Sequence, residues 1–324
     1  MKKFFLFLIS IFTLNLQASQ ILHHNVSESS PSHTWEQNEL QPFDELIVSW
    51  DASRPEKGYY LLTISLFTKD WSSAMNYAFW SSLDQNTFNQ QPENFPVKVF
   101  QDAAEVLNGE KATGFKVTIQ AHDGASLKDV RALHACSTNL KEQKVSQDAG
   151  KYETISLNVK GISQFAIPDP RNKRICSPTS TTAAINFLSP SLNIDPFVFA
   201  EQVRDSAFDI YGNWILNTAQ ASNLLGKPWH SYVGRLTSFD DIFTSLKRGC
   251  PVVVSVRGPL SGSALPYESG HLILIRGFNE EERRVLCMDP AFPQNDLTLV
   301  SYDLKDFLQA WARRGGVSYL FYKE

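Results

Sequence analysis

The sequence predicts an α+β protein of two domains. A mostly antiparallel, β-sandwich-like domain precedes a domain with a helical half and an antiparallel sheet. The chain has 324 residues, of which 43% are hydrophobic, and this is enough for two ordinary domains with their own cores. Short strand-like segments dominate the first half, whereas helical and then β-branched segments dominate the second. We place the two domains at residues 41–160 and 161–324.

The first eighteen residues have the pattern of a secretory signal peptide. Two lysines precede an apolar run from Phe4 to about Leu14, small and polar residues follow, and we expect cleavage after Ala18. The run is shorter than the ~20 residues that a spanning helix needs, and a retained N-terminal anchor is the alternative. We therefore expect an exported protein, periplasmic or extracellular, with no integral membrane segment in the mature chain. Residues 19–40 are assigned as a linker.

The β-sandwich-like assignment rests on short apolar segments separated by Gly, Asn, Asp and Pro. Strands are expected at residues 45–52, 59–68, 95–103, 114–123, 130–137 and 154–160. The tryptophans Trp50, Trp71 and Trp80 favour packing within this sheet, with an aromatic groove for a glycan or peptide as the alternative.

Beyond residue 161, helical periodicity comes first and strands follow. Helices are expected at residues 177–188, 195–208, 213–226, 238–249 and 304–316, and strands at 251–258, 271–278, 284–290 and 317–324. Ser238 is expected to be the N-cap of its helix. The polar sequence NEEER joins the strands 271–278 and 284–290 and suits a hairpin.

Several classes of partner are disfavoured by composition and motif. The net charge of -4 and the lack of a long basic patch give no indication of nucleic-acid binding. His122 and His134 fall in separate strands without a neighbouring Cys or carboxylate cluster. His230, in GKPWHSYV, has no carboxylate placed to orient it. We therefore expect neither a metal nor a cofactor.

The four cysteines allow two interpretations. An even count in an exported chain suggests two disulfides. The apolar surroundings of Cys250 and Cys287 are instead typical of inert core thiols. The pairing of Cys136 and the participation of Cys176 in a disulfide stay open at this point.

Cys176 stands at the start of a helix, in the sequence ICSPTSTTAAINFL. A helix N-terminus carries about half a positive charge, which favours a thiolate there. A buried structural thiol fits the same stretch equally well. A nucleophile also needs a base, a group that orients the base, and donors for the oxyanion.

His271 and Asp289 are the expected base and orienting carboxylate. His271 opens a strand after the Gly- and Ser-rich loop at residues 258–269, and Asp289 ends the next strand. If the two strands form a hairpin, the start of one lies beside the end of the other. A satisfied surface histidine and a plain turn residue before Pro290 are the alternatives. Gln164, upstream of the cysteine, could supply an oxyanion donor.

These residues and their order resemble those of a known family. The segments ISQ, CSPTSTTAAINFL, YGNWILNTAQA, PVVVSVR, GHLILIRGF, VLCMDPAF, FLQAW and VSYLF resemble the papain-like cysteine peptidases, in particular exported, stand-alone relatives of the bacteriocin-processing peptidases that cut after a double glycine. The resemblance covers residues 161–322. It implies a papain-like catalytic domain with Cys176 as nucleophile, His271 as base, Asp289 as its orienting carboxylate and Gln164 as the oxyanion glutamine.

The chain departs from that family in two ways. Ser177 replaces the glycine of the common Cys-Gly-Pro, and the chain has a signal sequence and an extra domain. Cleavage after a double glycine is therefore not carried over. We expect an exported cysteine peptidase or amidase that acts on a peptide or protein. The alternatives are an acyltransferase with the same triad and a catalytically silent peptide- or glycan-binding module, and the N-terminal domain could recognise a surface or a glycan.

Overall fold

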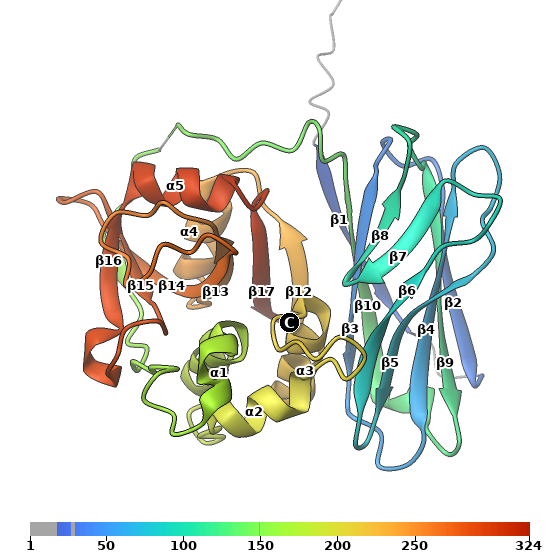
Figure 1. Cartoon of the computed structure of the whole chain (residues 1–324), viewed down its shortest axis with the longest axis horizontal. Helices are drawn as coiled ribbons and strands as arrows, with labels where there is room; N and C mark the ends of the chain where they lie inside the picture. The colour runs from blue at the N-terminus through green and yellow to red at the C-terminus, as the bar shows by residue number, and fades with distance from the viewer. Residues whose placement is uncertain (1–17, 27–29, 149) are drawn as a thin grey trace, which may run out of the picture.

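The computed structural model describes residues 18–26, 30–148 and 150–324 as two domains that lie side by side (Figure 1). The expected signal peptide falls almost wholly outside these ranges. None of the helices among the described residues is both long and apolar enough to cross a membrane. The α+β architecture predicted from the sequence is confirmed, with an antiparallel N-terminal domain followed by a domain of helices and an antiparallel sheet.

The N-terminal domain is one path of ten hydrogen-bonded strands. They are β1 (Ser19–Asn25), β2 (Ser32–Gln37), β3 (Glu45–Ala52), β4 (Tyr59–Phe67), β5 (Met75–Ser81), β6 (Gln85–Gln90), β7 (Val97–Gln101), β8 (Ala103–Val106), β9 (Gly114–His122) and β10 (Val130–Thr138). Their order is β1-β10-β3-β8-β7-β6-β5-β4-β9-β2, and each neighbouring pair is antiparallel.

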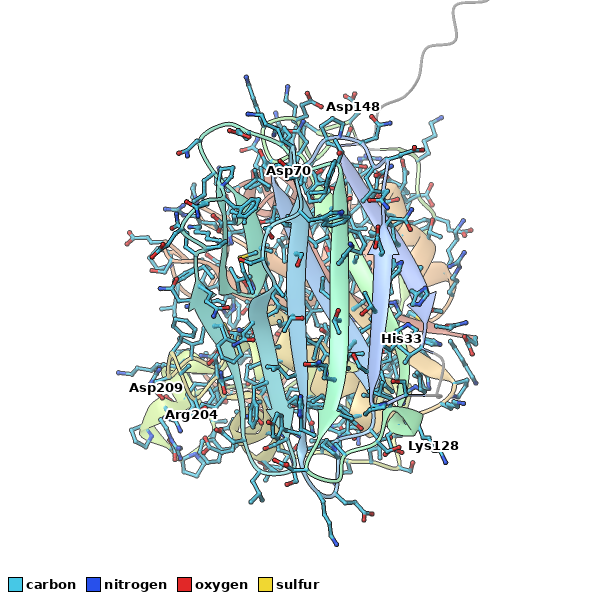
Figure 2. All side chains as sticks on the ribbon, turned by 90° about the vertical axis from the view of Figure 1, so that its right-hand side faces the viewer. His33, Asp70, Lys128, Asp148, Arg204 and Asp209 are labelled. Carbon is cyan, nitrogen blue, oxygen red and sulfur yellow. The ribbon has the colours of Figure 1, made fainter. Side chains whose placement is uncertain are left out.

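This sheet folds over so that its two halves face one another. Tyr77 of β5 donates its hydroxyl to the Val48 carbonyl of β3 (3.2 Å) and accepts from the Val48 N–H (2.9 Å). The buried rings of Trp50 and Trp80 meet edge to face with centroids 5.9 Å apart. Both indoles therefore belong to the core, as predicted. The domain has the shape of a flattened barrel that stays open between β1 and β2, and Figure 2 shows one half of the sheet from outside.

Two assignments in this region were wrong. The expected linker at residues 19–40 contains β1 and β2, which pair with β10 and β9. Both are the end strands of the path, and edge strands carry few apolar residues, so they lack a clear hydrophobic pattern. Of the strand expected at residues 154–160, only β11 (Ile155–Ser156) is present, and it pairs with the sheet of the second domain and not with the first.

The second domain has a sheet covered on both faces. Its helices are α1 (Cys176–Leu188), α2 (Pro196–Val203), α3 (Trp214–Leu225), α4 (Phe239–Lys247) and α5 (Leu304–Ala312), and its remaining strands are β12 (Trp229–Arg235), β13 (Val252–Val256), β14 (His271–Asn279), β15 (Arg284–Met288), β16 (Leu299–Asp303) and β17 (Val317–Lys323). The strand order is β12-β17-β13-β14-β15-β16. Ser238 caps α4, as predicted.

Alternation along the central strands explains the two layers. Val253 and Leu274 share a core with α1, α2 and α3, whereas Val252 and Val254 share one with α4 and α5. Successive side chains of a strand point to opposite faces, so nearly continuous apolar strands are buried on both sides. Figure 1 shows α1–α3 and α4–α5 on opposite sides of this sheet.

Buried polar contacts join the two domains. Arg235 of β12 makes a two-pronged ion pair with Glu45 of β3, with N–O distances of 2.6 and 2.8 Å. The backbone N–H of Trp214, at the start of α3, donates to Asp102 (3.1 Å). The loop before α3 is held in turn by Arg204 and Asp209 (2.7 Å), which lie together in Figure 2.

Candidate active site

Helix α1 places Cys176 at its first turn. The helix is buried along most of its length, and its polar side chains bond across to the sheet. The Ser180 hydroxyl donates to the Leu272 carbonyl of β14 (2.9 Å), and the Ser177 hydroxyl pairs with the Tyr319 hydroxyl of β17 (2.9 Å). These contacts fix Cys176 beside the first residues of β14. The N-cap residue of α1, Ile175, makes no side-chain capping bond. The positive end of the helix dipole is therefore directed at the region of the Cys176 thiol.

The hairpin predicted from NEEER is present and brings His271 to Asp289. Strands β14 and β15 pair antiparallel, with Leu274 opposite Met288. His271 opens β14, Asp289 follows the last residue of β15, and His271 Nε2 donates to Asp289 Oδ1 over 2.9 Å. Gly270 has φ of 99° in the left-handed region, which lets the preceding loop turn into β14.

Asp289 is fully buried and is held by more than the histidine. The hydroxyls of Tyr267 (2.7 Å) and Tyr302 (2.6 Å) both donate to Oδ2, and the Ala291 N–H donates to Oδ1 (3.0 Å). The Tyr267 ring also stacks on His271 with centroids 4.1 Å apart. The carboxylate is therefore fixed in position and ionised. Burial opposes its charge, but the facing His271 and the hydroxyls of Tyr302 and Tyr267 together outweigh burial and lower the pKa of Asp289.

Neither tyrosine was predicted from the sequence. Tyr267 lies in the Gly- and Ser-rich loop singled out before His271, so its closeness to the site could have been inferred from the sequence. Tyr302 lies in β16, a strand that was not predicted, and its contact with Asp289 depends on the pairing of β15 with β16.

The surroundings of the thiol and the imidazole favour their charged forms. Burial disfavours the thiolate, yet the His271 imidazolium and backbone N–H groups lower the pKa of Cys176 below that of an ordinary thiol. Burial likewise disfavours the imidazolium, but Asp289 and the Cys176 sulfur raise the pKa of His271 to about 10. Because Nε2 is held by Asp289, Nδ1 is the ring nitrogen left available to the Cys176 sulfur.

The other three cysteines differ from Cys176 in their burial and in the direction of their pKa shifts. All four cysteines are unpaired, so the two-disulfide alternative is wrong for this structure. Cys136, Cys250 and Cys287 are buried, and burial raises the pKa of each. Cys176 is only half-buried and is the one cysteine whose pKa is lowered. It combines access with thiolate character, the combination that makes a cysteine reactive.

Gln164 lines the same cleft as Cys176 and His271. Its backbone N–H donates to the Pro290 carbonyl (2.9 Å), which ties it to the residue after Asp289. Its side-chain amide donates one N–H to the Asn172 carbonyl (2.8 Å), leaving the second N–H for another acceptor. The four residues predicted from the sequence are thus gathered at one place.

The cleft has a volume of about 540 Å³. The charged side chains that line it are Lys173 and Glu268, and Leu265, Pro266 and Phe165 contribute apolar walls. A larger groove of about 860 Å³ is lined by residues of the 158–169 segment and of α1 and α2, but by none of Cys176, His271 and Asp289. The chemistry of the smaller cleft makes it the candidate active site.

Two of the three histidines set aside in the sequence, His134 and His230, have a carboxylate partner. His134 Nε2 lies 2.7 Å and His230 Nδ1 2.5 Å from Asp51 Oδ2, and all three residues are buried. The expectation that neither histidine has a carboxylate near it was wrong. Asp51 is separated from both by more than eighty residues of sequence, so nothing local could reveal the contact.

Comparison with known proteins points to one family. No curated protein matches the chain. A crystal structure described as a C39-like peptidase from Bacillus anthracis is similar, with 18% identity and a TM-score of 0.41 over 53% of this chain and 99% of that one. Residues 156–319, about half of the chain and the part that holds the candidate site, match the family model described as the Peptidase_C39 like family. The chain belongs to the Peptidase_C39 like family.

Proposed function

We propose that the protein is an exported cysteine peptidase or amidase that uses Cys176, His271 and Asp289. The observation that carries the proposal is the pairing of a half-buried thiol of lowered pKa with a histidine whose second nitrogen is held by a buried carboxylate. Family membership supports peptidase chemistry. Export is part of the proposal because of the pattern of the first eighteen residues.

Acylation begins with the thiolate of Cys176. Its sulfur attacks the carbonyl carbon of the scissile amide and forms the C–S bond while the carbonyl oxygen becomes an oxyanion. The second amide N–H of Gln164 and the backbone N–H of Cys176 are the donors proposed for that oxyanion. His271 Nδ1 then gives its proton to the amine, the C–N bond breaks, and a thioester remains.

Deacylation reverses the role of the histidine. Neutral His271 takes a proton from water, and the resulting hydroxide attacks the thioester carbonyl. The C–S bond breaks, the acid leaves, and the thiolate–imidazolium pair is restored. Asp289 keeps the Nε2 proton in place throughout, so Nδ1 is always the nitrogen that exchanges protons.

The test is to trap the acyl-enzyme. The mature chain is offered a p-nitrophenyl ester as a generic acyl donor, together with peptide and cell-wall-fragment libraries, and acid-quenched samples are analysed by mass spectrometry. We expect one acyl adduct on Cys176 that forms and decays with product release. Cys176→Ala should form none, while the matched Cys250→Ala variant should behave as wild type.

Two results would count against the proposal. Adducts spread over several cysteines would show that Cys176 is not specially reactive. Equal turnover in wild type and Cys176→Ala would show that the cysteine is not the nucleophile. Adding an amine acceptor separates hydrolysis from acyl transfer, because a transferase releases the acyl group as a new amide.

A further inference from the structure

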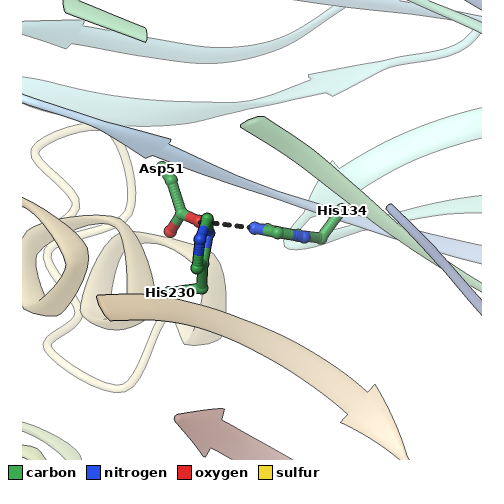
Figure 3. Close-up of side chains that lie close together, drawn as sticks. All are labelled: Asp51, His134 and His230. Atoms are coloured by element: carbon green, nitrogen blue, oxygen red, sulfur yellow. Dashed lines mark hydrogen bonds and ion pairs between the residues drawn. The ribbon is translucent and has the colours of Figure 1, made fainter. Parts of the chain in front are cut away.

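A second cluster of chemical groups lies between the two domains. Asp51 comes from β3, His134 from the neighbouring strand β10, and His230 from β12 of the catalytic domain (Figure 3). One ligand-capable atom of each residue lies within 4.8 Å of the other two. None of the three lines the catalytic cleft. The mechanism proposed above therefore makes no use of them.

Strand register and domain docking bring the three side chains together. In the β3–β10 register His134 lies opposite Ser49 and Ala132 opposite Asp51, so His134 and Asp51 are diagonal neighbours on one face. His230 approaches the same carboxylate oxygen from the other domain. The Ser231 N–H donates to the remaining oxygen, Oδ1, over 3.2 Å.

Burial makes this convergence costly unless the charges are compensated. The exposed fractions of Asp51, His134 and His230 are 0%, 1% and 5%. A buried carboxylate needs several donors or a cation. Here one nitrogen of each imidazole lies within hydrogen-bond distance of the same oxygen, Oδ2, so the three possible ligand atoms are gathered at one point.

The outer nitrogens of both histidines also have partners. His230 Nε2 lies 3.1 Å from the Glu324 carboxylate, and His134 Nδ1 lies 2.7 Å from His23 Nδ1. Histidines that bind metals nearly always use the second nitrogen in this way, which fixes the ring and its tautomer. A carboxylate behind His230 is the common form of that support.

We propose that Asp51, His134 and His230 form a binding site for a divalent transition-metal cation, of which Zn²⁺ is the best fit. Two imidazoles and one carboxylate are the ligands that Zn²⁺ accepts, whereas Ca²⁺ and Mg²⁺ prefer oxygen alone. Metal–ligand bonds of about 2.0–2.1 Å place tetrahedral ligand atoms roughly 3.3 Å apart. The two imidazole nitrogens, which lie 2.7 and 2.5 Å from Asp51 Oδ2, would therefore each move away from that oxygen by less than about an ångström. A small molecule or the protein backbone supplies any fourth ligand.

The position of the site gives the ion a structural role. His230 belongs to the catalytic domain, and Asp51 and His134 belong to the N-terminal domain. A bound cation would compensate the Asp51 charge and connect β12 to β3 and β10. It would hold the two domains together without entering the reaction of Cys176.

The test measures metal binding in the full mature chain. A Cys176→Ala background removes the catalytic thiol as a competing metal ligand. The protein is stripped with EDTA, desalted, titrated with Zn²⁺ against a competing chelator, and analysed for metal content by mass spectrometry. We expect about one Zn²⁺ per chain. In that background His230→Ala should weaken binding more than 100-fold, and Glu324→Gln should weaken it about tenfold.

His33→Ala is the matched control, because His33 pairs with His24 (2.9 Å) in a histidine pair on the N-terminal domain, away from Asp51. It should leave Zn²⁺ binding unchanged. Glu324 is 64% exposed, so we expect Glu324→Gln to fold. This variant therefore still tests the proposal if His230→Ala fails to fold. A folded chain that binds well below one Zn²⁺, or equal binding in the parent and Glu324→Gln chains, would overturn the proposal.

Discussion

Two buried carboxylates in this molecule each orient histidines, but their surroundings differ. Asp289 holds one histidine, His271, whose other nitrogen is left available to the half-buried thiol of Cys176 in the same cleft. Asp51 holds two histidines, His134 and His230, whose other nitrogens face a histidine and a carboxylate inside the domain interface. In the functions proposed above, the same residue types would serve proton transfer in one place and cohesion in the other, and the neighbour of the second nitrogen would decide which.

The largest effect should come from replacing the histidine at the cleft. We expect His271→Ala to lower the rate of thioester formation on the order of 10⁴-fold, since both the thiolate and the proton donor are lost. We expect the domain to stay folded, because the His271 ring lines the cleft and is not part of a hydrophobic core cluster. Steady-state turnover of the generic ester, with circular dichroism as the folding control, measures this. Retained turnover would mean that another group acts as the base.

Replacing the carboxylate should shift the pH profile. Asp289 raises the pKa of His271 to about 10, so the imidazolium is lost only above that pH. In Asp289→Asn that support is gone and the pKa of His271 falls. The alkaline limb of activity must therefore move to lower pH, and turnover should fall by roughly 10²-fold or more. An unchanged alkaline limb would show that Asp289 does not act through His271.

Replacing the interface histidine should cost stability. His230→Ala leaves Asp51 buried with one fewer donor, and removal of one partner of a buried ion pair costs about 3 kcal/mol. Denaturant unfolding in the presence of EDTA measures this independently of any metal. His33→Ala should lose less than about 1 kcal/mol. Equal losses in the two variants would remove the contrast between the interface cluster and a peripheral histidine pair.

The smallest effect should come from a tyrosine behind Asp289. Tyr302→Phe removes one of the two hydroxyls on Oδ2, and a single buried hydrogen bond is worth about 1 kcal/mol. We expect turnover to fall about three- to tenfold. Tyr60→Phe is the matched control, because its hydroxyl donates to the Ser126 carbonyl in the N-terminal domain. A fall as large as that of Asp289→Asn would mean that Tyr302 contacts the substrate.

The pairing of His271 with Asp289 could be predicted because its geometry is local. A hairpin with a short polar turn fixes where its two ends meet, and Cys176 is placed by the start of one helix. The five helices and most strands also followed from periodicity, but β5, β6, β12 and β16 were not predicted. The edge strands β1 and β2 did not follow from it either, because polar residues on edge strands resemble a linker.

The interface cluster could not be predicted for the opposite reason. Asp51 and His230 are 179 residues apart in sequence, and neither stretch contains a motif. Only the docking of β12 against β3 brings them together. Gln164 is an intermediate case: its place in the cleft was predicted, but its bond to the Asn172 carbonyl depends on the path of the connecting loop.

The central claim is that Cys176 is a thiolate paired with the His271 imidazolium. It is tested most directly by the rate of iodoacetamide labelling of each cysteine across pH, mapped by peptide mass spectrometry. We predict fast labelling of Cys176 at about pH 6, slow labelling of Cys136, Cys250 and Cys287, and loss of the fast reaction in His271→Ala. Equal, slow labelling of all four thiols, or fast labelling of Cys176 that survives in His271→Ala, would contradict it.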